Sequence, residues 1–475
     1  MNELVTDVPG RMDRLPWLRW HTMIVVALGV TWILDGLEVT IVGAIGSALE
    51  SPLTLGLTSA EVGLSASAYI AGAIGGALFF GHLTDKWGRK RLFLYTLLLY
   101  VLATVATGCS WNVWSFIVFR FFTGTAIGGE YAAINSAIDE LLPARVRGFA
   151  ALAINGSYWV GTAMGALSST VLLNPTIFAP SVGWRLAFLL GGVLAVAVVL
   201  VRTHVPESPR WLMLHGRNAE AVAIVEKAEA EAKRRGLPLT GEVGTLRIQL
   251  GQHISLLTVA KTILGKYRAR AVLGLSLMLS QAFFYNAIFF TYALVLTKFF
   301  QVLPEHVGWY LLPFAAGNFF GPLLLGRLFD HAGRRVMIVS TYATSGVLLL
   351  ITGFLFRQGV LDATTQTVCW CVVFFFGSAA ASSAYLTVSE LFPLEIRALA
   401  IALFYAVGTG AGGVAAPALF GALIGTGDPS RVFLGYALGA ALMLLAAGVA
   451  AKLAVNAERK SLEELAMPLT AARER

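Results

Sequence analysis

Long apolar runs limit what this chain of 475 residues can fold into. A helix of about 20 apolar residues spans the hydrocarbon core of a bilayer. Composition agrees, because 57% of the residues are hydrophobic and only 13% are charged. The runs are too long for membrane β-strands and lack their strict alternation. The sequence therefore predicts an all-α membrane protein with twelve transmembrane helices, at about 22–48, 61–83, 92–109, 112–139, 148–172, 184–202, 270–298, 306–328, 336–356, 364–391, 398–424 and 430–455.

Basic residues predict the orientation of these helices. They gather around alternate loops, as at 86–91 and 334–335, whereas the loops near 49–60, 108–112 and 173–184 contain no Lys or Arg. Loops rich in Lys and Arg stay in the cytoplasm. We therefore expect a multi-pass protein of the cell (inner) membrane with both termini cytoplasmic. The net charge of +8 reflects this bias and does not indicate nucleic-acid binding.

Two motifs occur twice, in the same order. The hinge motif, Gly-x3-Asp-x2-Gly-Arg, follows the second and eighth runs, and the turn motif, Glu-x2-Pro-x3-Arg, follows the fourth and tenth. The hinge residues are Gly81, Asp85, Gly88 and Arg89, then Gly326, Asp330, Gly333 and Arg334; the turn residues are Glu140 and Arg147, then Glu390 and Arg397. Such duplication predicts two six-helix bundles, 1–203 and 269–475, which face each other as in transporters.

The segment between the bundles, 204–268, is expected to be an intracellular helical linker. Its first half predicts an exposed helix that Asn218 can cap and Gly236 can end, because Glu and Lys or Arg recur there with i,i+4 spacing. A second amphipathic stretch covers about 255–264.

Charged residues at these turns predict a gate. Asp85 and Asp330 can cap helix N-termini or pair with nearby arginines. We expect ion pairs within each turn, namely Glu140 with Arg147, Glu390 with Arg397 and Glu207 with Arg210, that hold the bundles together when the inner side is shut. The alternative is ordinary loop capping combined with the positive-inside bias.

Four charged residues lie well inside the predicted helices, away from their ends, and all belong to the first bundle: Asp35, Glu38, Arg120 and Glu130. A charge at bilayer depth costs at least about 2.5–3.5 kcal/mol on insertion scales, so it usually marks function or pairing. A carboxylate whose arginine partner approaches and withdraws has a different proton affinity in each state, as proton coupling requires. A permanent structural ion pair is the alternative, and whether Asp35 or Glu38 carries the proton stays open.

The repeated motifs, together with Pro206-Glu-Ser-Pro-Arg210, resemble those of the major facilitator superfamily over essentially the whole chain. The last motif is typical of the sugar-porter branch. The resemblance implies alternating access, with Glu38 and Arg120 in the positions of that branch's proton-linked pair. Asp35-Gly-Leu-Glu38 is also similar to the Asp-Gly-x-Asp signature of aromatic-acid/proton symporters.

The same resemblance implies a substrate pocket. Its candidates are Asn155, Gln281, Tyr285, Asn286, Asn318 and Tyr385. Gln281 and Asn286 lie about 140° apart on an ideal helix, so we expect the helix to unwind locally if both face the cavity. The pocket has fewer hydroxyl partners than a sugar site needs, which favours a small organic acid. A sugar or polyol porter, working by symport or uniport, is the alternative.

Other classes fit less well. A non-transporting membrane sensor is a second alternative, although only about 20 residues follow the last predicted helix. The sequence contains no nucleophile elbow, phosphate loop or clustered metal ligands, so we expect no enzyme, cofactor or metal site. The expected partners are the small-molecule substrate, a proton and the lipid bilayer, with the chain acting as a monomer.

Overall fold

Helices dominate the computed structural model, which describes residues 3–202, 205–241, 243–249, 261–289, 291–303 and 306–469. The first half contains α2 (Arg19–Leu49), α3 (Ser59–Trp87), α4 (Arg89–Gly108), α5 (Val113–Leu141), α6 (Arg147–Gly156), α7 (Tyr158–Leu172) and α8 (Pro180–Arg202). The second half contains α12 (Arg268–Phe289), α13 (Tyr292–Phe300), α14 (Val307–His331), α15 (Arg334–Arg357), α16 (Ala363–Glu390), α17 (Arg397–Gly408), the π-helical η4 (Thr409–Gly413), α18 (Val414–Gly425) and α19 (Pro429–Leu453). The predicted all-α class is confirmed.

Each of the twelve predicted regions contains helix, and three of them are divided. The breaks separate α6 from α7, α12 from α13, and α17 from α18. Nine helical stretches within the described ranges are long and apolar enough to cross a membrane. Helix α5 is not among the nine, because Arg120 and Glu130 lower its hydropathy.

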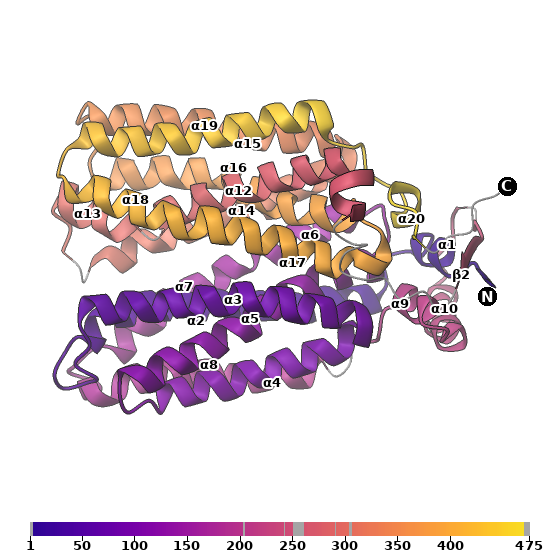
Figure 1. The fold of residues 1–475 in the computed structure, drawn as a ribbon, viewed down its shortest axis with the longest axis horizontal. Helices are drawn as coiled ribbons and strands as arrows, with labels where there is room; N and C mark the ends of the chain where they lie inside the picture. Colours follow the sequence, from indigo (N-terminus) through magenta and orange to yellow (C-terminus); the bar gives the residue numbers. More distant parts are fainter. Residues whose placement is uncertain are drawn as a thin grey trace.

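The two halves lie side by side with their long helices roughly parallel (Figure 1). Helix α6 packs against α14, and α17 packs against α3, so each half contributes to the contact between them. Smaller elements gather at one end, which we call the charged end: α1 (Val8–Asp13), α9 (Pro209–Leu214), α10 (Asn218–Arg234), α20 (Leu462–Leu465), β1 (Glu3–Thr6) and β2 (Leu246–Gln249). The two strands pair antiparallel.

The predicted linker helix is confirmed as α10, with one correction. Its N-cap is Arg217, and Asn218 is the first helical residue. The Asn218 side chain accepts a hydrogen bond from Thr6 Oγ1 instead of capping the helix. Within the second amphipathic stretch, residues 255–260 lie outside the described residues, and Thr262–Lys266 form the π-helical turn η1.

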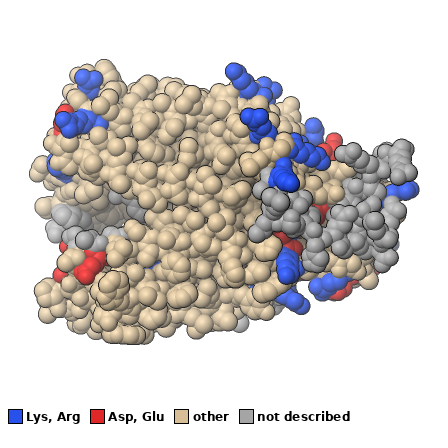
Figure 2. Space-filling view, viewed as in Figure 1, with Lys and Arg blue, Asp and Glu red and all other residues tan. Residues whose placement is uncertain are grey.

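The surface is suited to lipid along most of its length. Figure 2 shows Lys, Arg, Asp and Glu side chains near the two ends of one face and a broad uncharged belt between them. Large apolar side chains such as Phe79, Leu102 and Leu445 are exposed. Exposed apolar surface on this scale marks an interaction site in a soluble protein and is the expected exterior of a membrane protein.

Glycines set the close contact between α3 and α5. A methyl group added at Gly76 would overlap the backbone oxygen of Thr125, and one added at Gly128 would overlap that of Ala73. Small residues at such crossings let two membrane helices pack backbone to backbone. The close approach of α3 and α5 therefore depends on glycine at these positions.

Two adjacent glycines provide a direct test of this packing. We expect Gly76→Ala to lower the free energy of unfolding by about 1–3 kcal/mol, because the added methyl forces the helices apart. Gly75→Ala is the matched control, since a Cβ at Gly75 meets nothing within 4 Å. Thermal unfolding in detergent should show a lower Tm for the first variant only; equal Tm values would contradict the packing argument.

Candidate functional site

A cavity of about 420 Å³ lies between the two halves. Its wall includes Arg120 and Asn155 from the first half and Gln281 from the second. It extends to Leu49 and Val62, which lie next to the α2–α3 loop at the end opposite the charged end. The cavity therefore reaches from the middle of the protein toward the end opposite the charged end.

Most of the predicted pocket residues line this cavity. They are Asn155, Gln281, Tyr285, Asn286 and Tyr385. Asn318 has a different position: it is fully buried, and its Oδ1 accepts a 2.7 Å hydrogen bond from the hydroxyl of Tyr285. Asn318 therefore positions a residue of the cavity wall.

The expected unwinding between Gln281 and Asn286 is wrong. Both residues line the cavity, yet α12 is continuous from Arg268 to Phe289. The cavity also takes in Ala282, Tyr285 and Phe289, so more than one face of this helix borders it. The break in this region comes later, before Tyr292.

Aromatic rings from both halves form much of the wall, and sequence reasoning missed most of them. Trp32 and Tyr131 of the first half lie edge to face, with ring centroids 4.6 Å apart. Tyr131 stacks on Tyr405 of the second half at 4.6 Å and on Tyr385 at 6.2 Å. Their signal in the sequence is the presence of Tyr and Trp, which carry a polar tip, inside otherwise apolar runs.

Two polar side chains in this wall have unused hydrogen-bonding groups. Both the Oδ1 and Nδ2 atoms of Asn155, and the Nε1 atom of Trp32, are buried without a hydrogen-bond partner among the described residues. Asn286, in contrast, donates to the backbone oxygen of Ala282 at 2.6 Å. Buried polar groups are normally paired, so the unpaired ones mark places where another molecule can bind.

The predicted pair of buried charges is present. Arg120 Nη1 lies 2.5 Å from Glu38 Oε1, and both side chains are 2% exposed. The Arg120 guanidinium also lies over the ring of Tyr69, 4.4 Å from its centroid. Asp35 is buried one turn before Glu38 on α2, and Glu130 is buried on α5. Arg120 thus belongs both to an ion pair and to the cavity wall.

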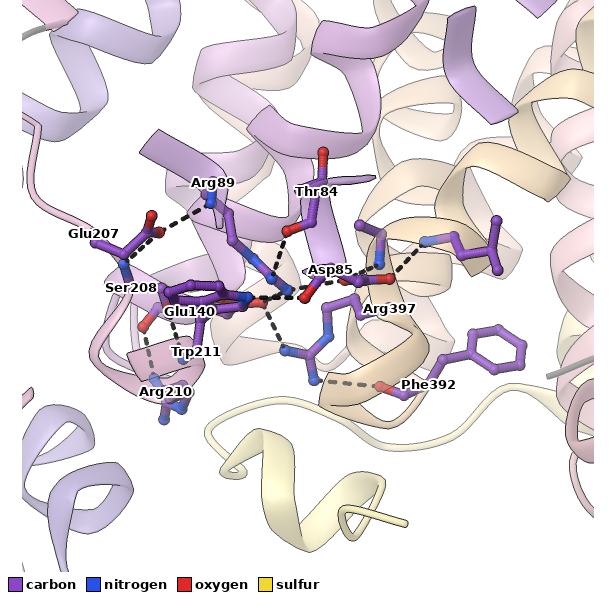
Figure 3. Close-up of polar contacts among 12 residues, drawn as sticks. Thr84, Asp85, Arg89, Glu140, Glu207, Ser208, Arg210, Trp211, Phe392 and Arg397 are labelled. Carbon is purple, nitrogen blue, oxygen red and sulfur yellow. Dashed lines mark hydrogen bonds and ion pairs between the residues drawn. The ribbon is translucent and has the colours of Figure 1, made fainter. Parts of the chain in front are cut away.

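At the charged end, the first hinge motif binds a helix of the second half (Figure 3). The Asp85 carboxylate accepts hydrogen bonds from the backbone N–H groups of Ala398 and Leu399, at 3.3 and 3.1 Å, in the first turn of α17. Arg89 bridges Asp85 and Glu140, at 3.2 and 2.7 Å. The first half therefore caps a helix of the second.

The second hinge motif makes the same contacts in the opposite direction. The Asp330 carboxylate accepts from the N–H groups of Gly148 and Phe149, at 3.1 and 2.7 Å, in the first turn of α6. Arg334 bridges Asp330 and Glu390, at 2.9 and 3.0 Å. The two halves thus exchange helix caps.

The hinge glycines allow this geometry. Gly88 and Gly333 have φ of 97° and 105°, a region that favours glycine. A Cβ at Gly81 would lie 2.6 Å from the Cβ of Ala402 on α17, whereas a Cβ at Gly326 would lie 3.4 Å from the Cβ of Leu152 on α6, which is an ordinary contact. A larger residue at Gly81 would therefore push the two halves apart.

The ion pairs expected within each turn motif are wrong. Glu140 pairs with Arg397 at 3.6 Å, and Glu390 pairs with Arg147 at 3.5 Å. Each glutamate therefore binds the arginine of the other half. The reason is that each arginine begins the next helix, which packs against the opposite half.

The expected pair between Glu207 and Arg210 is also wrong. Glu207 accepts from the backbone N–H groups of Arg89 and Lys90 and caps α4. Burial raises the pKa of the Glu207 carboxyl above its ordinary value, although these hydrogen bonds and the charge of Arg89 oppose the shift. Glu458 accepts from the N–H group of Arg334 in the same way, a role that sequence reasoning missed.

Arg210 instead connects three distant segments. It binds Glu463 in the C-terminal tail, the backbone oxygen of Glu140, and Asp13 near the N-terminus, each at 2.9 Å. Among the described residues, no three His, Cys, Asp or Glu side chains are grouped to hold a metal ion. The clusters at the charged end are therefore built from ion pairs and helix caps.

Comparison with known proteins adds evidence over the whole chain. The model of the family described as sugar (and other) transporter matches residues 29–467. The niacin transporter NiaP of Acinetobacter baylyi is 28% identical over 464 residues, which cover 97% of this chain and all of the relative. The 4-hydroxybenzoate transporter PcaK of the same species is 25% identical over 428 residues, which cover 88% of this chain and 87% of the relative.

A solved structure has the same fold. The proton:xylose symporter XylE, a member of the major facilitator superfamily, superimposes with a TM-score of 0.78 at 18% identity, covering 94% of this chain and 98% of that one. The likeness at this identity concerns the fold alone. Together with the family match, it supports the resemblance indicated by the hinge and turn motifs: the chain belongs to the sugar (and other) transporter family and has the fold of a major facilitator superfamily member.

Proposed function

We propose that this chain is a proton-coupled symporter that carries a small aromatic carboxylic acid across the cell membrane by alternating access. The observation that carries the proposal is that Arg120 belongs both to the cavity wall and to the Glu38 ion pair. We infer no enzymatic reaction, and we expect the chain to work as a monomer. We place the boundaries between the first bundle, the linker and the second bundle near 203/204 and 268/269.

The wall of the cavity supports an aromatic substrate. Tyr131, Tyr385 and Tyr405 offer stacked ring faces, on which a flat ring can pack. Asn155 supplies unused polar groups for a ring substituent, whereas Asn286 is already bonded to its own helix. A hexose needs a polar partner for each of its hydroxyls, and a site that lacks such partners discriminates strongly against it. The relatives NiaP and PcaK are named as transporters of niacin and 4-hydroxybenzoate, which are both aromatic acids, and this agrees with an aromatic acid as the substrate.

Coupling follows from competition for Arg120. In this structure Glu38 neutralises Arg120, with the two charged groups 2.5 Å apart. When Glu38 takes up a proton, the guanidinium is free to bind a carboxylate in the cavity. A bound carboxylate in turn favours the protonated form of Glu38. Proton and acid therefore bind cooperatively, and the halves rearrange with both or with neither.

Orientation follows from the positive-inside rule. We place the charged end in the cytoplasm, so that both termini are cytoplasmic and the cavity opens toward the outside. In this orientation the exchanged helix caps of Asp85 and Asp330 form the closed inner gate. The ion pairs around these caps, such as Glu140 with Arg397 and Glu390 with Arg147, share partners. We therefore expect the whole set of contacts to break together when the gate opens.

Uptake into proteoliposomes tests the substrate class. With an inward proton gradient, we expect saturable accumulation of nicotinate or 4-hydroxybenzoate, and equilibration only when an ionophore collapses the gradient. An aliphatic acid of similar size and a hexose are the comparison substrates. Accumulation of hexose alone would overturn the proposal in favour of a sugar porter.

The variant Glu38→Gln tests the coupling. Because glutamine mimics the protonated carboxyl, Arg120 stays available to the substrate and the protein no longer needs a proton. We therefore expect proton-driven accumulation to be lost while exchange of labelled for unlabelled substrate continues. Glu50→Gln, an exposed carboxyl at the end of the same helix, is the control and should accumulate normally. Survival of accumulation in Glu38→Gln would refute the assignment.

The variant Asp85→Asn tests the gate. Hydrogen bonds to a charged acceptor contribute roughly 1.5–3 kcal/mol, so their weakening should reduce the transport rate roughly 10-fold without changing membrane insertion. Asp362→Asn is the matched control, because Asp362 also caps a helix but lies within one half, at the end of α16 opposite Glu390. A defect in insertion alone, or an equal loss in both variants, would argue against a gating role.

A further inference from the structure

The N-terminal segment 3–18 folds onto the linker at the charged end. Strand β1 pairs with β2, and α1 packs on α9 and α10. The buried side chains of Val8, Met12, Leu15 and Leu18 share one apolar cluster with Trp211 and with residues of α10. Leu394, from the turn motif of the second half, belongs to the same cluster. The segment is therefore an ordered part of the structure that contacts both halves.

Ion pairs fasten this segment to the linker. Arg11 and Arg14 both bind Glu229 on α10, at 2.6 Å each. These pairs lower the pKa of the Glu229 carboxyl, chiefly through the Arg11 hydrogen bond. The backbone N–H of Arg19 donates to Glu231. The position of the residues between these anchors is thus set by the linker.

Between these anchors, Asp13 points into the inner gate. Its Oδ2 lies 2.9 Å from Arg210 Nη2, and its Oδ1 lies 3.5 Å from Arg147 Nη2. Its Oδ1 also accepts from the backbone N–H of Ala144, at 3.3 Å. The Asp13 side chain is only 16% exposed, and both guanidinium groups are fully buried.

Both arginines that Asp13 binds reach across to the second half. Arg147 pairs with Glu390 and donates to the backbone oxygen of Lys460. Arg210 pairs with Glu463 in the tail that follows α19. These contacts exist only while the charged ends of the halves are together.

We propose that Asp13 is a positioning residue of the inner gate, which holds Arg147 and Arg210 in place for their partners in the second half and so makes the N-terminal segment a strap that favours the closed gate. The proposal rests on the alternating access of the proposed function but not on its substrate.

The direction of the effect follows from burial. In the closed gate water is excluded, so the carboxylate of Asp13 interacts strongly with two buried positive charges that otherwise repel each other. In an open gate water reaches both guanidinium groups and can form the hydrogen bonds that Asp13 otherwise accepts. The loss of Asp13 then costs little free energy. Neutralising Asp13 therefore destabilises the closed state more than the open one.

Thiol labelling of a buried reporter tests the strap without substrate. In a background with Cys109, Cys369 and Cys371 replaced, Leu152→Cys places a thiol on α6, buried against Gly326 of the second half. Its labelling rate by a maleimide in detergent measures the population of the open gate. We expect Asp13→Asn to increase this rate roughly 10-fold, the effect of losing one hydrogen bond to a charged group.

Three controls separate gating from general damage. Asp7→Asn, on the same segment but 43% exposed, should leave the rate unchanged, and Asp13→Glu should restore most of the wild-type rate. Leu97→Cys, buried inside the first half, should label no faster in Asp13→Asn. An unchanged or slower rate at Leu152→Cys, or equal acceleration of both reporters, would overturn the proposal. Uptake experiments do not enter this test, so a wrong substrate assignment leaves its outcome unaffected.

Discussion

The exchange of helix caps between the halves is the contact on which the rest of this structure depends. Asp85 accepts from the first turn of α17, and Asp330 accepts from the first turn of α6. A carboxylate is favoured at a helix N-terminus because unpaired N–H groups and the helix dipole both attract it. The two capped helices, α6 and α17, also contribute Asn155 and Tyr405 to the cavity wall, so the caps connect the charged end to the cavity.

The interior of the protein is less symmetric than its gate. Glu38 and Arg120, the ion pair beside the cavity, both belong to the first half. The aromatic wall is shared, since Tyr131 of the first half stacks on Tyr405 of the second. A substrate ring held between these tyrosines would contact both halves at once. Such a position lets substrate binding influence their relative arrangement, as alternating access requires.

Local sequence predicted local structure well, and contacts between distant segments poorly. Apolar runs and repeated motifs were sufficient for the helices, and the resemblance to sugar porters indicated the pairing of Glu38 with Arg120, where few charges compete for a partner. At the gate many charges compete, and the prediction that each glutamate pairs with the nearest arginine in the sequence is wrong. Glu140 binds Arg397 and not Arg147. Which pairs form depends on how α6 and α17 cross to the opposite half. Asp13 was missed because α1 has only 6 residues, too few for their apolar spacing to indicate where the segment docks.

Proton uptake on substrate binding tests the competition for Arg120 most directly. Purified protein in weakly buffered solution, mixed with an aromatic acid that it binds, should take up about one proton per bound acid, reported by a pH indicator. The Glu38→Gln variant should bind the acid with no proton uptake. Binding by the wild-type protein without proton uptake would contradict the exchange of Arg120 between Glu38 and the substrate.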